Sequence, residues 1–332
     1  MPRAKVLVTG AAGFIGSHVA RHALDAGFDV VALDDLSGGS LDNVPPKATW
    51  TEGSVTDYEL LKVMFERERF TYVYHLAAYA AEGLSHFIRR YNYDTNLIGS
   101  VNLINLSVLH SVRCFVFTSS IAVYGANQVP MSEDLTPEPE DPYGISKYAI
   151  ELDLRAAHRQ FGLPFICFRP HNVYGERQNI GDKYRNVVGI FMNQILQGKP
   201  LTIFGDGEQS RAFSSIDDVA PVIALSPLNE QAYGETFNVG GDVASTVNEL
   251  AKIVADAMGV APNIQHLSAR NEVKHAFASH EKVRRFFPLP APIPLEDGIG
   301  RMAAWVRQVG SRRTKPFASI EIPHGLPDGW AS

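Results

Sequence analysis

Three side chains in the middle of the chain have the types and the spacing of an acid–base site. Tyr143 and Lys147 are four residues apart, so on a helix they share one face and the ammonium group can lie beside the phenol. A tyrosine with an ordinary pKa of about 10 needs about three units of depression to act as a base near pH 7, which nearby cations can supply. Ser120 can hydrogen-bond the reacting oxygen. By itself, the Tyr-Lys spacing also fits an exposed pair on a helix surface.

A glycine-rich turn near the N-terminus can bind a pyrophosphate. A β-rich run leads into the sequence GAAGFIG, from Gly10 to Gly16, where a helix begins. Glycines in this turn let the backbone bend tightly and approach a phosphate, while the helix N-terminus supplies free N–H donors and the positive end of a dipole. For this motif alone, a tight turn between strand and helix with no ligand is the alternative.

The acidic residue after the second β-rich run favours NAD over NADP as the dinucleotide. Asp34 lies 18 residues beyond Gly16, where a carboxylate can accept hydrogen bonds from an adenosine ribose and repel a 2′-phosphate. An arginine beside it would reverse that choice, and the neighbour is Asp35. Bound NAD would add the cation of its nicotinamide ring to that of Lys147 beside the Tyr143 phenol. Taken alone, Asp34 can equally be a loop carboxylate.

The elements that must position these side chains alternate along the chain. Short β-rich runs, typical of buried strands, occur at 6–9, 30–33, 72–76, 114–119, 165–169 and 236–239. Stretches with apolar residues at helical spacing lie at 14–26, 58–68, 94–110, 143–160 and 247–258. Thr246 and Glu249 form a capping-box pattern at the start of the last of these, and Gly259 follows its end. This alternation predicts right-handed crossovers, and hence an α/β fold with a doubly wound parallel (Rossmann) sheet.

The composition changes after Pro170, where glycines and prolines become frequent. We interpret this as a smaller, loop-rich substrate-binding domain. The predicted parts are a NAD-binding Rossmann domain over 1–169 with a return of the chain near 212–240, a substrate-binding domain over 170–211 and 241–310, and a C-terminal tail over 311–332.

Composition and charge restrict the class of protein. The chain has 332 residues, of which 45% are hydrophobic and 20% charged, values of an ordinary globular protein. Its formal net charge of -6 disfavours non-specific attraction to nucleic acid or to an anionic membrane. No secretory leader pattern opens the sequence, so we expect a cytoplasmic protein. His18 and His22 have a metal-binding spacing but no third ligand, and we predict no metal site.

Further motifs complete the pattern. HLAA stands at 75–78, TNL at 95–97, RPHNVYG at 169–175 and FGDG at 204–207. With the glycine turn, the acidic residue and the Tyr-Lys pair, they make the chain similar over nearly its whole length to the extended short-chain dehydrogenase/reductases. Within these it resembles the NAD-dependent epimerase/dehydratase family, which acts on nucleotide sugars. The resemblance implies NAD as the cofactor and Ser120, Tyr143 and Lys147 as the catalytic residues.

The resemblance also implies which residues contact cofactor and substrate. Besides Tyr143 and Lys147, cofactor contacts are expected at Gly10, Gly13, Phe14, Ile15, Gly16, Asp34, Asp35, Ser54, Val55, Leu76, Ala77, Ala78 and Asn96. Contacts with a UDP-sugar are expected at Ser120, Asn172, Asn186, Val187, Arg211, Arg270 and Ala276. The two arginines suit the diphosphate, because guanidinium groups pair bidentately with phosphate oxygens. Ser54 departs from the family, which often has an aspartate there. Helices 94–110 and 143–160 resemble those that pair in homodimers of the family.

Ile121 and Ala122 discriminate among the reactions of the family. Its 4,6-dehydratases have an Asp-Glu pair at this place, and its decarboxylases have a glutamate where Ala122 stands. What remains is reversible hydride transfer at one carbinol carbon, so the resemblance implies C4 epimerisation. Tyr143 would take the O4 proton while NAD takes the C4 hydride, and the 4-keto sugar would rotate before the hydride returns to its other face.

The sequence leaves the hexose open. We expect UDP-glucose and UDP-galactose type sugars, with UDP-N-acetylglucosamine or UDP-glucuronate as alternatives. Alignment with the family puts Ala276 at the position that gates the C2 substituent, where a small residue makes room for an acetamido group. A rival from another class is an NAD-binding redox sensor without catalysis on the same fold. Such a protein is expected to lose Tyr143 or Lys147, and both are retained.

Overall fold

A parallel sheet of seven strands forms the centre of the molecule, in the order β11-β6-β5-β4-β1-β2-β3. The structure, a computed structural model, describes residues 3–270, 272–313, 317–327 and 330. The strands of the sheet are β1 (Lys5–Thr9), β2 (Asp29–Asp34), β3 (Thr49–Glu52), β4 (Tyr72–His75), β5 (Cys114–Thr118), β6 (Phe165–Pro170) and β11 (Thr236–Val239). Every pairing in it is parallel, so the predicted doubly wound sheet is confirmed.

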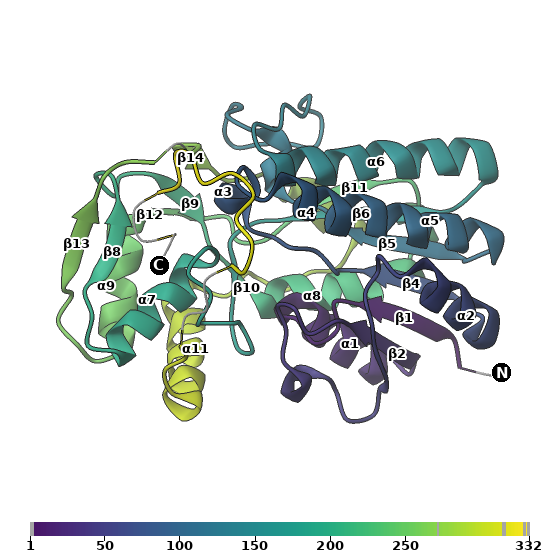
Figure 1. Cartoon of the computed structure of the whole chain (residues 1–332), viewed down its shortest axis with the longest axis horizontal. Helices are drawn as coiled ribbons and strands as arrows, with labels where there is room; N and C mark the ends of the chain where they lie inside the picture. The colour runs from purple at the N-terminus through teal and green to yellow at the C-terminus, as the bar shows by residue number, and fades with distance from the viewer. Residues whose placement is uncertain (1–2, 271, 314–316, 328–329, 331–332) are drawn as a thin grey trace.

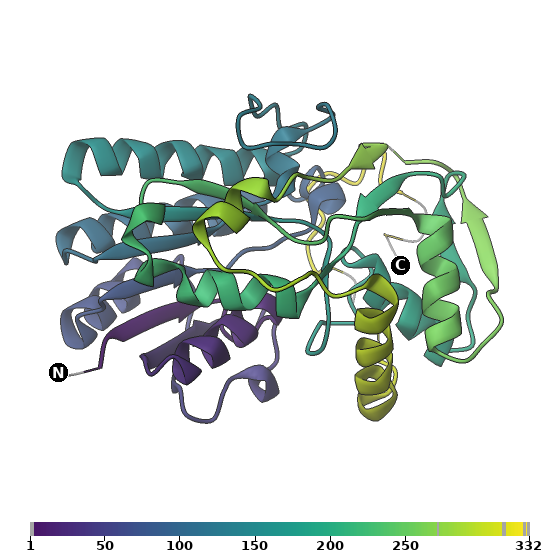
Figure 2. The ribbon, with the colours of Figure 1, turned by 180° about the vertical axis from the view of Figure 1, so that it is seen from behind.

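Helices cover both faces of this sheet (Figures 1 and 2). One face carries α2 (Tyr58–Glu68), α5 (Gly99–Leu109) and α6 (Pro142–Phe161), over a core of leucine, valine and phenylalanine side chains. The other carries α1 (Phe14–Asp25) and α8 (Ile216–Leu225), which pack against each other. The strand order reverses between β1 and β4, and ligands of such sheets bind in the crevice outside the carboxyl ends of the strands at this point.

The start of α6 is fixed by local chemistry, which matters because Tyr143 lies in its first turn. The side chain of Asp141 caps the helix, accepting a hydrogen bond of 2.9 Å from the backbone N–H of Gly144. Pro142 occupies the first helical position, where its missing N–H costs nothing. The helix ends at Gly162, which adopts a left-handed φ of 73°.

The second half of the chain builds a smaller body with its own apolar core. Its strands are β7 (Val173–Tyr174), β8 (Leu201–Phe204), β9 (Ser210–Ala212), β10 (Ser214–Ser215), β12 (Ala244–Thr246), β13 (Ile264–Leu267) and β14 (His275–Ala276). Its helices are α7 (Val187–Leu196), α9 (Val247–Ala257) and α11 (Leu295–Val309). The predicted capping box is present, because Thr246 and Glu249 each bond the other's backbone N–H.

The chain returns to the large sheet twice. Within residues 212–240, α8 packs on α1 and β11 joins β6. A second return was not expected, since α10 (Glu281–Phe286) lies within the segment predicted for the substrate domain but contacts β11. Phe286, at the end of α10, and Phe287, directly after it, pack edge-on against Phe237 of that strand, which explains the attachment.

The predicted C-terminal tail folds back over the body. Figure 1 shows this yellow segment passing beside α3 (Glu82–Ser85) and α4 (Arg89–Tyr93). The carboxylate of Glu321 accepts hydrogen bonds of 2.8 Å from the first N–H groups of α4, and Trp330 is buried. Of this segment, residues 314–316, 328–329 and 331–332 lie outside the described part. Among the described helices, none is both long and apolar enough to cross a bilayer.

Candidate active site

A cavity of about 1320 Å³ opens where the strand order reverses, between the large sheet and the smaller body. The loops that follow β1, β2, β4, β5 and β6 contribute to its wall, as does the segment between β7 and α7. Its size suits a dinucleotide together with a second ligand of similar extent, because small-molecule sites are commonly about 300–1,000 Å³.

The glycine turn after β1 has the geometry of a phosphate-binding cradle. A Cβ at Gly16 would lie 2.0 Å from the carbonyl oxygen of Gly10, so no side chain fits there. Gly10 itself has a φ of 69° and passes so close to Ala77 that a Cβ would lie 2.7 Å from its nitrogen. Gly13 begins α1 without a side-chain cap, and no acidic residue follows in the first turn. The N–H groups and the positive end of α1 are therefore available to an anion.

Asp34 is held at the end of β2 in a position that suits a ribose. Its carboxylate accepts hydrogen bonds from the backbone N–H groups of Ala12 (3.0 Å) and Leu36 (2.8 Å). Burial raises the pKa of Asp34, and these two hydrogen bonds oppose that rise. With the side-chain-free cradle beside it, the site fits NAD: the turn would hold the pyrophosphate, and Asp34 the adenosine ribose.

The three predicted catalytic side chains meet in the cavity. Ser120 follows β5, and Tyr143 and Lys147 reach in from α6. Burial raises the pKa of Tyr143 well above its ordinary value, and a hydrogen bond with the Ser120 hydroxyl opposes this. Burial also lowers the pKa of Lys147 to about 7. The phenol is thus not an activated base in this pocket by itself, because the cation expected from the nicotinamide ring is part of what would stabilise a phenolate.

A buried ion pair fixes α6 against the sheet. Glu151, one turn beyond Lys147 on the same helix, contacts the guanidinium of Arg169 from β6 at 2.5 Å. It also accepts a hydrogen bond of 2.6 Å from Ser119, next to the predicted catalytic serine. Both members of the ion pair are almost fully buried. The network therefore ties the helix that carries Tyr143 to the strand ends that carry Ser120 and Asn172.

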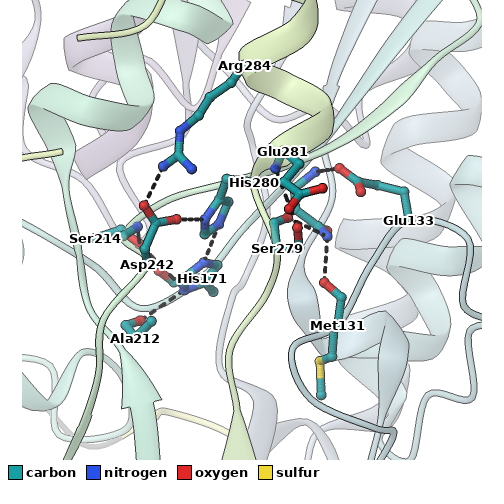
Figure 3. A network of polar contacts seen from close by, with 12 residues as sticks. Met131, Glu133, His171, Ala212, Ser214, Asp242, Ser279, His280, Glu281 and Arg284 are labelled. Atoms are coloured by element: carbon teal, nitrogen blue, oxygen red, sulfur yellow. Dashed lines mark hydrogen bonds and ion pairs between the residues drawn. The ribbon is translucent and has the colours of Figure 1, made fainter. Parts of the chain in front are cut away.

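A chain of polar side chains begins at His171, the residue before Asn172 in the sequence (Figure 3). Nδ1 of His171 donates to the carbonyl oxygen of Ala212 at 2.9 Å, so Nε2 of this ring accepts from Nε2 of His280, also at 2.9 Å. Burial lowers the pKa of His171 to about 3, which keeps its ring neutral. His280 in turn contacts Asp242, which pairs with Arg284. These contacts join the end of β6 to β9, the strand of Arg211.

The two arginines expected to hold a diphosphate both line the cavity and contact the same carboxylate. Arg211 contacts Glu272 at 3.6 Å and donates a hydrogen bond of 2.9 Å to the carbonyl oxygen of Lys274. Arg270 lies 3.1 Å from the same Glu272 carboxylate and 4.7 Å from the ring centre of Phe204. A diphosphate that binds both guanidinium groups must therefore compete with Glu272.

Most of the residues expected from the sequence line this one cavity. The exceptions are Ser54 and Asn96, which lie outside its lining. The amide of Asn96 is fully engaged, since it accepts from the N–H of Tyr79 at 2.8 Å and donates to the carbonyl oxygen of Tyr79 and to Asn92. Asn96 thus fixes the loop after β4, while Ser54 bonds Thr56 beside the cavity wall.

Sequence reasoning missed several residues of the cavity wall. Glu82 lines it and was not among the predicted site residues. Tyr79 also lines it, and the guanidinium of Arg185 lies 4.9 Å from the centre of its ring. Arg185 also pairs with Asp182 at 2.6 Å. Tyr79 lies in the loop that follows β4, and Glu82 begins the short helix α3 after it. Segments at the carboxyl ends of strands line such sites, so their position was the available signal.

Comparison with known proteins places the chain. Residues 6–240 match the model of the NAD dependent epimerase/dehydratase family. A UDP-glucose 4-epimerase of Mycolicibacterium smegmatis is 32% identical over 91% of this chain and 98% of its own length. A UDP-glucuronate 4-epimerase of Thermodesulfobacterium geofontis is 29% identical over 91% of this chain and 96% of its own.

Solved structures show the same fold. The UDP-glucose 4-epimerase of Thermotoga maritima, solved with UDP-glucose, superposes with a TM-score of 0.88 at 34% identity, covering 92% of this chain and 99% of that one. Because the matched family is NAD dependent, the prediction of NAD as the cofactor is confirmed. This chain is a member of the NAD-dependent epimerase/dehydratase family.

Proposed function

We propose that the chain is a nucleotide-sugar C4 epimerase that interconverts UDP-glucose and UDP-galactose type sugars. The observation that carries this proposal is the composition of the wall around Ser120, Tyr143 and Lys147. Ile121 and Ala122 line the cavity next to Ser120, where a dehydratase or a decarboxylase needs a carboxylate. The remaining groups suffice for reversible oxidation at one carbon that bears a hydroxyl.

The side chains divide this work between them. The Tyr143 phenolate accepts the O4 proton as the C4–H bond breaks, and Ser120 donates a hydrogen bond to O4. NAD, when bound, supplies the acceptor of the C4 hydride and afterwards its donor. After the 4-keto sugar has rotated so that its other face meets the cofactor, Tyr143 returns its proton to O4 and C4 has the opposite configuration. No net oxidation occurs, because the hydride that leaves C4 returns to the other face of C4.

Rotation of the 4-keto hexose in the site requires firm binding of the nucleotide and loose binding of the hexose. Arg211 and Arg270 can supply the firm part, since two guanidinium groups give several charge-assisted hydrogen bonds to a diphosphate. Asn172 would contact the hexose, and its backbone carbonyl oxygen accepts a hydrogen bond of 3.2 Å from the N–H of Ser214. Binding energy placed on the diphosphate does not restrain the ring whose two faces must each reach the same catalytic group.

One observation favours a second substrate. Ala276 lines the cavity with a methyl group only, which leaves room for an acetamido group at C2. UDP-N-acetylglucosamine is therefore the alternative hexose within the same mechanism.

We also propose a homodimer through α5 and α6. The surface of these two neighbouring helices leaves large apolar side chains exposed, with Leu109 at 70%, Phe161 at 64% and Leu152 at 46%. Apolar groups on adjacent helices are typical of a face that a second copy covers.

Proton NMR tests the function with the purified protein and no added NAD. UDP-glucose, UDP-N-acetylglucosamine and UDP-glucuronate are incubated separately, and the anomeric signals are followed. Growth of the C4 epimer to an equilibrium mixture supports the proposal and identifies the sugar. Release of water or carbon dioxide from the sugar contradicts it, as does no change with any of the three after NAD is supplied.

A further inference from the structure

A carboxylate for which the C4 epimerase mechanism has no role lines the cavity. Glu82 is the first residue of α3, and its side chain is exposed to the interior of the cavity although protein surrounds it. None of the proposed steps of epimerisation uses this group. Its position must therefore be explained by something other than proton transfer at O4.

The position of Glu82 relative to the catalytic tyrosine is fixed. The hydroxyl of Ser85 donates to the carbonyl oxygen of Glu82 at 2.6 Å and contacts Asp141 at 3.3 Å. The same hydroxyl accepts a hydrogen bond of 3.2 Å from the backbone N–H of Tyr143. Because Asp141 also caps α6, these hydrogen bonds connect the short helix α3 to the first turn of α6. Glu82 and the catalytic phenol thus lie on connected helices.

Several charged groups of the cavity wall interact with Glu82. Arg211 and Arg270 attract its charge and Glu272 repels it. Asp141 also repels it, and Glu82 itself disfavours the phenolate of Tyr143. Glu82 therefore lies within electrostatic reach both of the arginines that would hold the diphosphate and of the tyrosine that would hold O4. A hexose bridging those two sites would lie within reach of the same carboxylate.

We propose that Glu82 sets the charge selectivity of the sugar site: its carboxylate accepts hydrogen bonds from a neutral hexose and excludes nucleotide sugars whose hexose carries a carboxylate. The inference rests on the proposed function, because it presumes that a UDP-hexose occupies this cavity. An acceptor aimed at hydroxyl groups favours the neutral sugar, while a second negative charge in a low-dielectric pocket is repelled. Selectivity here comes from a repulsive element as much as from an attractive one.

The selectivity should depend on pH, because burial and the neighbouring Asp141 raise the pKa of Glu82 to about 7. Below this pH Glu82 is neutral and the repulsion of a uronate is weak. Above it Glu82 is charged and the repulsion is complete, while the uronate stays ionised throughout. The other charged groups that face Glu82 are Asp141, whose pKa burial raises to about 6, His86, Arg211, Arg270 and Glu272.

Binding measured by calorimetry tests the inference without relying on turnover. The NAD-loaded protein is titrated with UDP-glucose and with UDP-glucuronate at pH 6 and pH 8. We expect UDP-glucuronate to bind at least about tenfold more weakly than UDP-glucose at pH 8, and the difference to shrink at pH 6. Glu82→Gln should bring the two dissociation constants within about threefold of each other at both pH values.

Two matched variants control this experiment. Glu82→Asp keeps the charge and should keep the discrimination, while Glu66→Gln removes an exposed carboxylate on α2 and should change neither constant. Equal binding of both sugars by the unaltered protein at pH 8, or an unchanged ratio in Glu82→Gln, overturns the inference. If Glu82→Gln abolishes the discrimination in a protein that binds UDP-glucose but never epimerises it, the role of Glu82 is supported and the proposed function fails. If the protein epimerises UDP-glucose but Glu82→Gln leaves the ratio of the two dissociation constants unchanged, the proposed function stands and the inference on Glu82 fails.

Discussion

The ammonium group of Lys147 donates a hydrogen bond of 2.7 Å to the backbone carbonyl of Thr118, at the end of β5. This bond holds the nitrogen 5.8 Å from the ring centre of Tyr143 and 4.8 Å from that of Phe117. Burial lowers the pKa of Lys147 to about 7, from an ordinary value of 10.5. The site therefore keeps a lysine whose positive charge is costly in the folded protein, as expected of a group retained for function.

The lowered pKa of Lys147 predicts a pH dependence of stability. Between about pH 7 and pH 10 the unfolded chain binds a proton that the folded chain does not, so this lysine makes stability rise with pH in that window. Lys147→Met removes the titration. The free energy of unfolding of the unaltered protein, minus that of Lys147→Met, should therefore increase from pH 7 to pH 10 in urea melts. The exposed Lys62→Met on α2 is the control; a difference for Lys147→Met that stays flat with pH contradicts the prediction.

Removing the phenol should abolish turnover and leave the fold intact. Tyr143→Phe deletes the group that exchanges the O4 proton, and loss of a general acid–base residue costs about 100- to 10,000-fold in rate. We expect a decrease of at least about 1,000-fold in kcat for the sugar that the NMR experiment identifies. NAD retention and the circular dichroism spectrum should not change. More than a tenth of the original rate in Tyr143→Phe would exclude Tyr143 as the base.

The ion pair behind the catalytic helix should matter for stability. Glu151→Gln leaves the guanidinium of Arg169, which is 1% exposed, without its counter-charge. Breaking one partner of such a buried pair costs about 3–5 kcal/mol of the free energy of unfolding. Arg155 contacts the same carboxylate at 3.8 Å from an exposed position, so Arg155→Gln should cost less than about 1 kcal/mol. Similar losses in the two variants would show that burial of the pair is not the cause.

Asp34 should decide between the two nicotinamide dinucleotides. Asp34→Ser removes the carboxylate that would bind the ribose, so NAD should bind about tenfold more weakly or worse, while NADP gains because its 2′-phosphate is no longer repelled. Fluorescence titration of protein freed of cofactor measures both constants. Asp25→Asn, at the exposed end of α1, is the control. An unchanged ratio of the two constants would remove Asp34 from the ribose site.

The predicted homodimer can be tested by substitution on the surface of α5 and α6. Leu152 is 46% exposed on α6, so Leu152→Glu should convert a dimer to a monomer in light scattering without unfolding it, because a charge is placed in an apolar contact. Leu41→Glu, an equally exposed change at 53% on the turn after β2, should leave the mass unchanged. A monomeric unaltered protein at micromolar concentration contradicts the predicted dimer.

The sequence predicts the central sheet well because its strands are buried on both faces and read as continuous apolar runs. The edge strand β3 was missed for the opposite reason: Thr49–Glu52 is half exposed and carries no such run. α11 was also missed, because the prolines before it indicate a loop and the helix begins directly after Pro294. In both cases the deciding contacts lie in the tertiary structure.

For the site, motif residues could be predicted and electrostatic partners could not. Gly10, Asp34 and Tyr143 lie on strand and helix ends whose order along the chain fixes their meeting point. Glu82 belongs to no motif, and its role depends on arginines from β9 and from the segment before β14, about 130 to 190 residues away along the chain. The raised pKa of Tyr143 likewise follows from burial, which no spacing reveals.

The most direct test of the central claim follows the hydrogen on C4. UDP-glucose carrying deuterium at C4 is incubated with the protein in ordinary water, and the C4 position of the product is examined by NMR and mass spectrometry. If a hydride leaves C4 and returns to its other face within one site, the UDP-galactose formed retains its deuterium completely, and turnover is slower than with the unlabelled sugar. Loss of deuterium to the solvent, or formation of a product other than the C4 epimer, would contradict the mechanism.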